Sequence, residues 1–288
     1  MTRRPSLLLA LLLIVATIST LISTVEPDVG QAARRDRKDV KTEVVRGLGV
    51  PDGKYPFVAA IGLVNETGGL KRQFCGGSLI APSYVLTAAH CVAGAKTESI
   101  AVVVGQSAFG SGQGETRTLT AIMIHPGFNQ RTLGNDVAVL QLNVPVLSIT
   151  PAARVGAGDS SFDVSGTPLT VVGWGNTVRY TLHQQKNRYP ERLQEGTITV
   201  IGSTHCAKQW RQVGFKKQFS TSLHLCTSAR RFGSGDSGSP LFSSVGGVYV
   251  QVSLVSGGFV GTKKKVADFG PRLSDPSIAA FITASVGG

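Results

Sequence analysis

The sequence predicts an all-β fold that ends in one α-helix, and three observations lead to this prediction. Short apolar runs rich in β-branched residues recur along the chain, which is typical of strands. Glycine, proline, asparagine and serine separate these runs, and the 288 residues include 35 glycines, enough for many tight turns. An apolar fraction of 42% against 16% charged residues allows the chain to bury a large core.

The expected strands follow one another between residues 57 and 255. They are predicted over residues 57–64, 84–87, 100–104, 119–124, 137–142, 169–172, 197–201 and 248–255. A helical signal occurs near the C-terminus, where Ser274 or Asp275 can cap a helix that begins at Pro276. Its apolar face is expected to consist of Ile278, Phe281 and Ile282.

The first 43 residues are expected to precede the folded domain. Arg3 and Arg4 come before an apolar run over residues 7–18, which is shorter than the about 20 residues of a membrane-spanning helix. This layout predicts that residues 1–25 are a signal peptide and that the protein is secreted. An uncleaved membrane anchor is the alternative, because the apolar stretch resumes at residues 21–22. The charge-dense residues 26–43 lack a core-forming pattern and predict a propeptide or linker.

Three separate motifs contain the residue types of a serine hydrolase. Ser237 lies between glycines in the sequence GDSGSP at residues 235–240, and His90 lies in TAAHC at residues 87–91. Asp136 opens a buried-type apolar run, where a carboxylate is expected only with a partner. A serine hydroxyl needs an imidazole to accept its proton and a carboxylate to orient that imidazole. We therefore predict that His90, Asp136 and Ser237 are catalytic. A Gly/Ser-rich loop alone would explain the first motif but not the other two.

The chain order of these residues resembles that of trypsin/chymotrypsin-family serine endopeptidases and differs from the orders of subtilisins and α/β-hydrolases. The resemblance extends from residue 44 to the C-terminus. It implies two six-stranded antiparallel β-barrels with a C-terminal α-helix, in one trypsin-like protease domain over residues 44–288. It also implies polypeptide substrates, no cofactor, and an oxyanion hole formed by the N–H groups of Gly235 and Ser237.

The same resemblance pairs the four cysteines as two disulfides. Cys75 would join Cys91 beside the predicted base, and Cys206 would join Cys226 ahead of the specificity pocket. A zinc site is the alternative, but the sequence lacks the C-x-x-C pairs that structural zinc sites use. We therefore expect no metal.

Two residues are expected to shape substrate binding. Arg231 stands six residues before Ser237, at the position that forms the pocket base in this family. A cation there would repel lysine and arginine and pair with glutamate or aspartate, whereas an arginine that reached solvent would leave an apolar pocket. Ser253 is expected near the catalytic aspartate, on a segment that pairs with the substrate backbone. A register that places Ser256 there is the alternative.

The sequence also resembles the family at its activation site. Residues 44–47 (VVRG) are similar to the mature N-terminus of the family, although Arg46 replaces a glycine. The resemblance implies a zymogen, in which cleavage after Glu43 frees an α-amine on Val44 that pairs with Asp236.

The formal net charge of +12 predicts a basic surface that could bind polyanions or anionic membranes. A basic polyanion- or membrane-binding protein on a protease fold is therefore the alternative to an enzyme, and the intact triad favours the enzyme. We expect a monomer with no specific nucleic-acid partner.

We expect His125 to be structural, and the remaining histidines, His183, His205 and His224, to occupy surface or loop positions.

Overall fold

The structure, a computed structural model, describes residues 47–65, 70–177, 189–215, 219–228, 232–258 and 266–287, without the side chains of residues 71 and 72. All of these residues lie in one unit, which spans residues 36–288. The predicted signal peptide (residues 1–25) and propeptide or linker (residues 26–43) lie outside the described residues, as do Val44 and Arg231.

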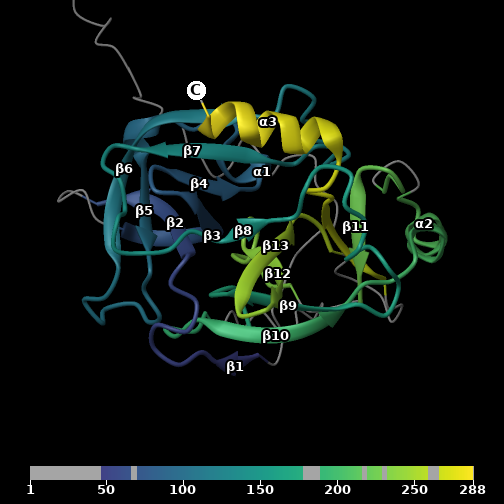
Figure 1. The fold of residues 1–288 in the computed structure, drawn as a ribbon, viewed down its shortest axis with the longest axis horizontal. Helices are drawn as coiled ribbons and strands as arrows, with labels where there is room; N and C mark the ends of the chain where they lie inside the picture. The colour runs from purple at the N-terminus through teal and green to yellow at the C-terminus, as the bar shows by residue number, and fades with distance from the viewer. Residues whose placement is uncertain are drawn as a thin grey trace, which may run out of the picture. The chain divides into compact units, whose positions relative to one another are not determined.

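Strands dominate this unit (Figure 1). They are β1 (Leu48–Gly49), β2 (Val58–Val64), β3 (Leu70–Ala81), β4 (Tyr84–Thr87), β5 (Ile100–Val104), β6 (Glu115–Ile124), β7 (Ala138–Leu142), β8 (Ala153–Arg154), β9 (Pro168–Gly173), β10 (Gln194–Thr199), β11 (His224–Thr227), β12 (Pro240–Val245), β13 (Val248–Leu254) and β14 (Asp268–Pro271). The helices are α1 (Ala89–Val92), the 3-10 helix η1 (Thr97–Ser99), α2 (Ser203–Gln212) and α3 (Pro276–Val286). Every strand predicted from the sequence overlaps one of these strands.

The first six long strands close into a barrel in the order β2-β3-β4-β7-β6-β5. Each neighbouring pair is antiparallel. The sequence pattern explains the closure, because β5 (IAVVV) is buried along its whole length and every strand contributes apolar side chains to the interior. Side chains with 0% exposure in this core include Ile61, Leu79, Val85, Val102 and Leu140.

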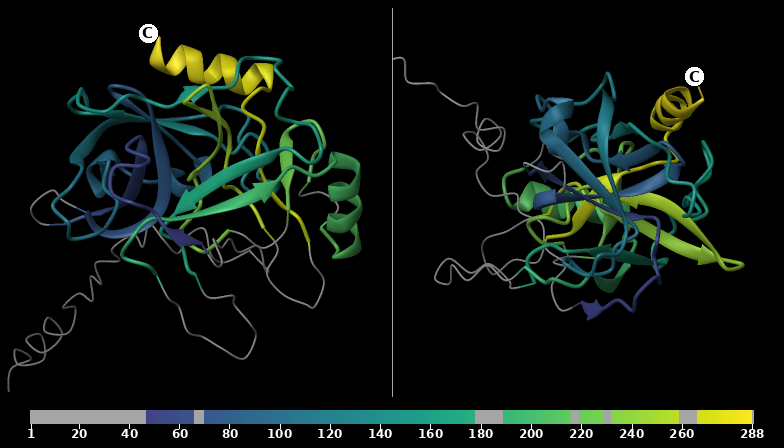
Figure 2. Two further views of the ribbon diagram at one scale, coloured as in Figure 1. Left: turned by 60° about the horizontal axis from the view of Figure 1, so that its bottom comes forward. Right: turned by 90° about the vertical axis from the view of Figure 1, so that its left-hand side faces the viewer.

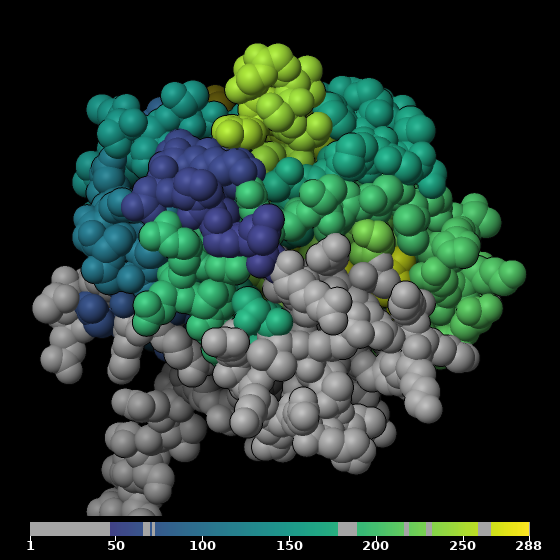
Figure 3. Space-filling view, turned by 90° about the horizontal axis from the view of Figure 1, so that it is seen from below, coloured from purple at the N-terminus to yellow at the C-terminus, as the bar shows by residue number. Residues whose placement is uncertain are grey.

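The second barrel consists of β9, β10, β11, β14, β13 and β12. Antiparallel ladders join β10-β9-β12-β13 and β11-β14. Two isolated antiparallel bridges complete the ring, from Val200 to Thr227 and from Gly257 to Phe269. The short strands β1 and β8 extend this half, and Figure 3 shows the residues around β1 in purple against the green segment that contains β10. The predicted double-barrel class is therefore confirmed.

An aromatic cluster joins the two barrels. The ring of Phe242 on β12 lies 5.1 Å from Tyr55 and 5.4 Å from Phe57, which precedes β2. Tyr249 on β13 completes the group, 5.4 Å from Phe242. Edge-to-face contacts of this kind add stability beyond the burial of apolar area. These contacts fix the position of one barrel against the other.

The C-terminal helix α3 is confirmed with its cap. Asp275 Oδ1 accepts the N–H groups of Ser277 at 2.9 Å and Ile278 at 3.3 Å, and Pro276 occupies the first turn. Ile278 and Ile282 pack into a core that includes strand β7 of the first barrel and Leu254 of β13. Figures 1 and 2 show α3 along one side of the first barrel and α2 at the far end of the second. No helix in the described part of the chain is long and apolar enough to span a membrane.

Helix α2 is not predicted from the sequence. Its buried residues are Cys206 and Trp210, one turn apart, on an otherwise polar helix. Trp210 Nε1 donates to Ala267 O at 3.0 Å, and Cys206 forms a disulfide with Cys226 of β11. Two buried residues one turn apart are a weak signal for a helix in the sequence. The helix is stabilised only once Ala267 and Cys226 are in place to bond to these two residues.

Candidate active site

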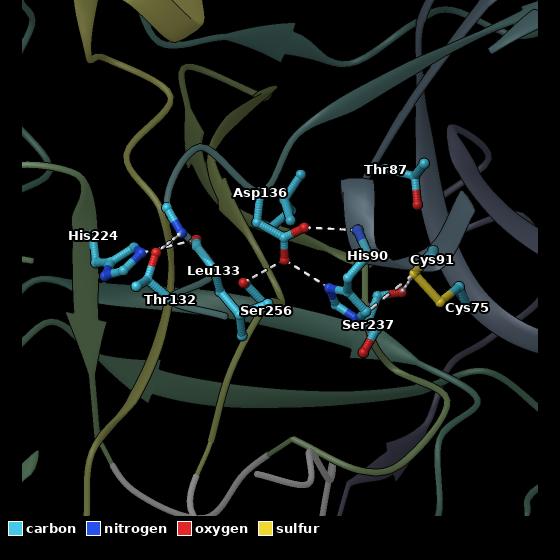
Figure 4. Close-up of polar contacts among 12 residues, drawn as sticks. Cys75, Thr87, His90, Cys91, Thr132, Leu133, Asp136, His224, Ser237 and Ser256 are labelled. Carbon is cyan, nitrogen blue, oxygen red and sulfur yellow. Dashed lines mark hydrogen bonds and ion pairs between the residues drawn. A yellow bond between two sulfur atoms is a disulfide. The ribbon is translucent and has the colours of Figure 1, made fainter. Parts of the chain in front are cut away.

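The three predicted catalytic residues come from both barrels and meet in one place (Figure 4). His90 lies on α1 directly after β4, and Asp136 lies in the loop before β7. Ser237 lies in the loop before β12 of the second barrel. His90 Nδ1 and Asp136 Oδ2 are 2.6 Å apart, and the main-chain N–H of His90 donates to Asp136 Oδ1 at 2.8 Å. These contacts orient the imidazole, and Figure 4 shows Ser237 beside its ring.

Asp136 is fully buried but remains a carboxylate. Burial raises the pKa of this group, yet the charge and hydrogen bonds of His90 and the hydroxyl of Ser256, 2.6 Å from Oδ2, outweigh it. The net effect holds the pKa of Asp136 below its usual value. An ionised Asp136 accepts Nδ1–H, so Nε2 of His90 is the nitrogen that can take a proton.

The prediction that Ser253 lies near the catalytic aspartate is wrong. Ser253 is buried within β13, where its hydroxyl donates to Pro271 O at 2.7 Å. The chain leaves β13 after Leu254, and the next serine, Ser256, contacts Asp136 instead. Counting residues from Ser237 could not distinguish the two registers, because the length of the β12–β13 hairpin sets which serine reaches the aspartate.

The backbone around Ser237 depends on a glycine. Gly238 has φ +82, and a Cβ atom there would lie 2.3 Å from Thr87 Oγ1 and 2.4 Å from Gly76 O. The N–H of Gly76 in turn donates to Ser237 O at 2.8 Å. The nucleophile loop is therefore pressed against β3 and β4 of the first barrel. Ser237 lies beside the His90 ring (Figure 4), and the described contacts include no hydrogen bond between the two side chains. Such contacts commonly tighten when substrate binds.

Two main-chain donors beside Ser237 remain unused. Within the described residues, neither the N–H of Gly235 nor that of Ser237 donates to another group. Gly235 has φ +103, which favours glycine, and its carbonyl accepts Gln73 Nε2 at 2.7 Å. The Gln73 contact was not anticipated from the sequence, because it joins residues that are far apart in the chain.

Asp236 lies in a buried cradle of main-chain groups. Its carboxylate accepts the N–H of Gly175 at 2.8 Å and that of Gly233 at 2.6 Å. A Cβ atom on Gly173 or Gly175 would come within 2.0 Å or 2.4 Å of this carboxylate. The sequence GWG at residues 173–175 thus has a physical reason, since only glycines leave room for the Asp236 side chain.

Both expected disulfides are present, Cys75–Cys91 and Cys206–Cys226. The first ties β3 to α1 directly after His90. Among the described residues, the cluster with metal-ligand geometry is Cys75, His90 and Cys91, and its two sulfurs are committed to this disulfide.

The histidines fall in three environments. His125 is buried and packs on Phe281 at 5.1 Å, and its Nδ1 accepts the N–H of Gly127. His205 is exposed on α2, as expected, and His183 lies outside the described residues. His224 differs from the expectation, because its side chain is completely buried.

The double barrel and the oriented Asp136–His90 pair beside a serine define the class of protein: a serine hydrolase built on two β-barrels. The sequence matches the Trypsin family over residues 44–275. The chain therefore belongs to the trypsin family, and it is a serine-type endopeptidase.

Curated relatives agree with this assignment. A trypsin of Saccharopolyspora erythraea is 31% identical over 191 residues, which covers 65% of this chain and 76% of the relative. A trypsin of Sarcophaga bullata is 32% identical over 208 residues, covering 72% of this chain and 76% of the relative. Serine protease 28 of Mus musculus is 29% identical over 245 residues, covering 82% and 88% respectively.

Proposed function

We propose that this protein is a secreted, monomeric endopeptidase that cleaves polypeptides through His90, Asp136 and Ser237. The contact that carries the proposal is the 2.6 Å hydrogen bond between His90 Nδ1 and the buried Asp136. Ser237 Oγ attacks the peptide carbonyl while His90 Nε2 accepts its proton, giving a tetrahedral intermediate. His90 then protonates the leaving amine, and the acyl-enzyme remains on Ser237. A water molecule, deprotonated by His90, hydrolyses the acyl-enzyme, which releases the acid and restores Ser237.

The unused N–H groups of Gly235 and Ser237 form the oxyanion hole in this proposal. Both N–H groups belong to the loop that contains the nucleophile. The backbone conformation of this loop at residue 235 favours glycine. Loss of one such donor typically raises the barrier by about 3 kcal/mol. The test of the catalytic assignment is turnover of a peptide substrate by the processed protein beside its Ser237→Ala variant, which should be inactive at unchanged stability.

Selectivity is proposed to differ from that of trypsin. Arg231 precedes Ser237 by six residues, and a cation in the pocket disfavours lysine and arginine and favours glutamate or aspartate. An apolar preference is the alternative if the guanidinium reaches solvent. A scan of peptides that vary the residue before the scissile bond separates the two. Arg231→Ser should abolish cleavage after glutamate, whereas Arg131→Ser, the same change at an exposed site, should not.

The substrate backbone is proposed to pair as an added strand with the segment that follows β13, beginning at Ser256 rather than Ser253. Gly257 in this segment carries no side chain, and the Phe269 ring fills the space that a Cβ would need, 2.5 Å away. The main-chain hydrogen bonds between Gly257 and Phe269, at 2.9 and 2.8 Å, also hold this segment in place.

We also propose that the chain is secreted as a zymogen, with residues 1–25 as signal peptide and residues 26–43 as propeptide. Cleavage after Glu43 would release the Val44 α-amine to pair with Asp236, the carboxylate buried in the glycine cradle. N-terminal sequencing of the secreted, active protein tests this. A mature chain that begins elsewhere with full activity would exclude it.

A second, compatible function is polyanion binding through the basic surface. His205, Lys208 and Arg211 line a surface hollow on α2 of about 860 Å³, together with Thr204 and Gln212. Among the described residues, this lining contains no acidic side chain, and the whole chain carries a formal charge of +12. Replacing Lys208 and Arg211 with glutamine should lower the salt needed to elute the protein from heparin without changing peptide turnover. An unchanged elution would remove α2 from this role.

A further inference from the structure

His224 is the first residue of β11 and is completely buried, on the side of Asp136 away from His90 (Figure 4). Its ring lies on that of Phe269, with centroids 4.5 Å apart, and beside Phe219 at 5.6 Å. Ser220 N donates to His224 Nδ1 at 3.1 Å, and His224 Nε2 is 3.0 Å from Leu133 O. An N–H group only donates and a carbonyl only accepts. The partners therefore fix the neutral tautomer with its proton on Nε2.

Leu133 belongs to the loop that contains Asp136 (Figure 4). This loop contains two non-glycine residues with left-handed backbone, Leu133 at φ +56 and Asn135 at φ +51. Such conformations are unfavourable for residues that have a side chain and persist only where surrounding contacts hold them. Within the first barrel, Asn135 Nδ2 donates to Gly127 O at 3.1 Å. From the second barrel, the hydrogen bond of His224 to the Leu133 carbonyl secures the loop three residues before Asp136.

The ring of Phe269, which His224 contacts, packs against the segment that holds the second oxygen-bonding partner of Asp136, Ser256. Phe269 and Gly257 exchange two main-chain hydrogen bonds, at 2.9 and 2.8 Å, and the Phe269 ring fills the space beneath Gly257. Gly257 directly follows Ser256, whose hydroxyl donates to Asp136 Oδ2. His224 is thus hydrogen-bonded to the loop before Asp136 and lies on the Phe269 ring that packs against the Ser256–Gly257 segment.

We propose that His224 is a positioning residue for peptide-bond hydrolysis, whose Nε2–H holds the Leu133 carbonyl and thereby keeps Asp136 in register with His90. The proposal rests on the triad proposed above, and His224 itself touches neither substrate nor Ser237. Its role requires a neutral ring. Burial, the largest influence, lowers the pKa of His224 to about 4. The charge of Asp136 raises this pKa and that of Arg272, which is paired with Asp163, lowers it.

The experiment compares His224→Met, which has similar volume but no donor, with His224→Gln, whose side-chain amide can donate to Leu133 O. For His224→Met we expect kcat to fall about tenfold, the equivalent of one hydrogen bond, with KM unchanged. The downfield proton resonance of the His90–Asp136 hydrogen bond should broaden or shift. His224→Gln should recover most of both properties, which a purely space-filling role for His224 does not predict.

Ser237→Ala separates this proposal from the triad on which it rests. If Ser237→Ala loses turnover and keeps the downfield resonance of the His90–Asp136 hydrogen bond, the triad is supported independently of His224. If Ser237→Ala retains turnover, the triad is refuted. A folded His224→Met variant with wild-type kcat and resonance would overturn the positioning role. If both His224 variants fail to fold, ¹⁵N-histidine spectra of the wild-type protein decide: a neutral Nε2–H ring at pH 7 supports the proposal, and a protonated ring or the Nδ1–H tautomer overturns it.

Discussion

The hydroxyl of Ser256 and the imidazole of His90 share one oxygen of Asp136, each at 2.6 Å from Oδ2. The second oxygen accepts the main-chain N–H of His90 at 2.8 Å. A fully buried carboxylate thus has three donors, which offsets the cost of removing its charge from water. The arrangement connects the two barrels through a single side chain, because Ser256 follows β13 and His90 follows β4.

Removing the Ser256 hydroxyl should weaken this arrangement in a pH-dependent way. In the wild-type protein the folded pKa of Asp136 is depressed, so its contribution is present above the unfolded value of about 3.9 and is lost as pH falls through the folded pKa. Ser256→Ala removes one cause of the depression, so the variant should be less stable than the wild type at neutral pH, and the difference should shrink as pH falls below about 3.9. The measurement is the free energy of unfolding of both proteins in urea at several pH values.

The matched control for this prediction is Ser253→Ala. Ser253 lies three residues earlier and bonds to Pro271 O, not to Asp136. Its variant should lose stability by the same amount at every pH. A pH-dependent loss of equal size in both variants would mean that the Asp136 hydrogen bond is not its cause.

Asp136→Asn should preserve the shape of the site while removing its charge. The amide cannot favour the Nδ1–H tautomer of His90, so Nε2 no longer reliably accepts the proton of Ser237. We expect kcat to fall by about four orders of magnitude, as in other Ser-His-Asp triads. Steady-state turnover together with a thermal melt checks this, and a loss of less than about tenfold would argue against a triad.

Gly238→Ala tests how tightly the nucleophile loop is pressed against the first barrel. The positive φ of +82 and a Cβ 2.3 Å from Thr87 Oγ1 both oppose a side chain. We expect the free energy of unfolding to fall by at least about 2 kcal/mol, with activity lost as Ser237 shifts. Chemical denaturation measures the first effect and a serine-directed inhibitor the second.

Gly246→Ala provides the comparison, because Gly246 has φ +57 and nothing lies within 4 Å of the added Cβ. This change introduces backbone strain without a steric contact, at the tip of the β12–β13 hairpin. It should cost only about 1 kcal/mol and leave activity intact. Equal losses in the two variants would show that strain, not contact with Thr87, limits position 238.

His224 predicts a characteristic loss of stability in mild acid. The folded pKa is about 4 against a reference value of 6.5, so between these values the unfolded chain binds a proton that the folded protein does not. Stability should therefore fall as pH decreases from about 6.5 to about 4, by up to about 1.4 kcal/mol per pH unit. Urea unfolding of the wild type and of His224→Gln at several pH values isolates this contribution, and parallel curves would contradict it.

Much of the fold is readable from local sequence. Runs such as IAVVV in β5 match a strand pattern wherever they lie, and Asp275-Pro276 marks a helix start from chemistry within one turn. Strands β3, β12 and β14 escaped prediction because their glycines, prolines and aspartate have low strand propensity. Their pairing is imposed by neighbours on both sides, which the sequence does not display.

The sequence by itself determined the residue types of the triad, the cysteines and the order of the catalytic motifs, because each depends on neighbours within a few positions. The tertiary structure alone decided that Ser256 and not Ser253 meets Asp136, that His224 is buried under the Leu133 loop, and that glycines 173 and 175 make room for Asp236. These are contacts between distant segments. Their geometry follows from barrel closure and hairpin length, to which all the strands contribute together.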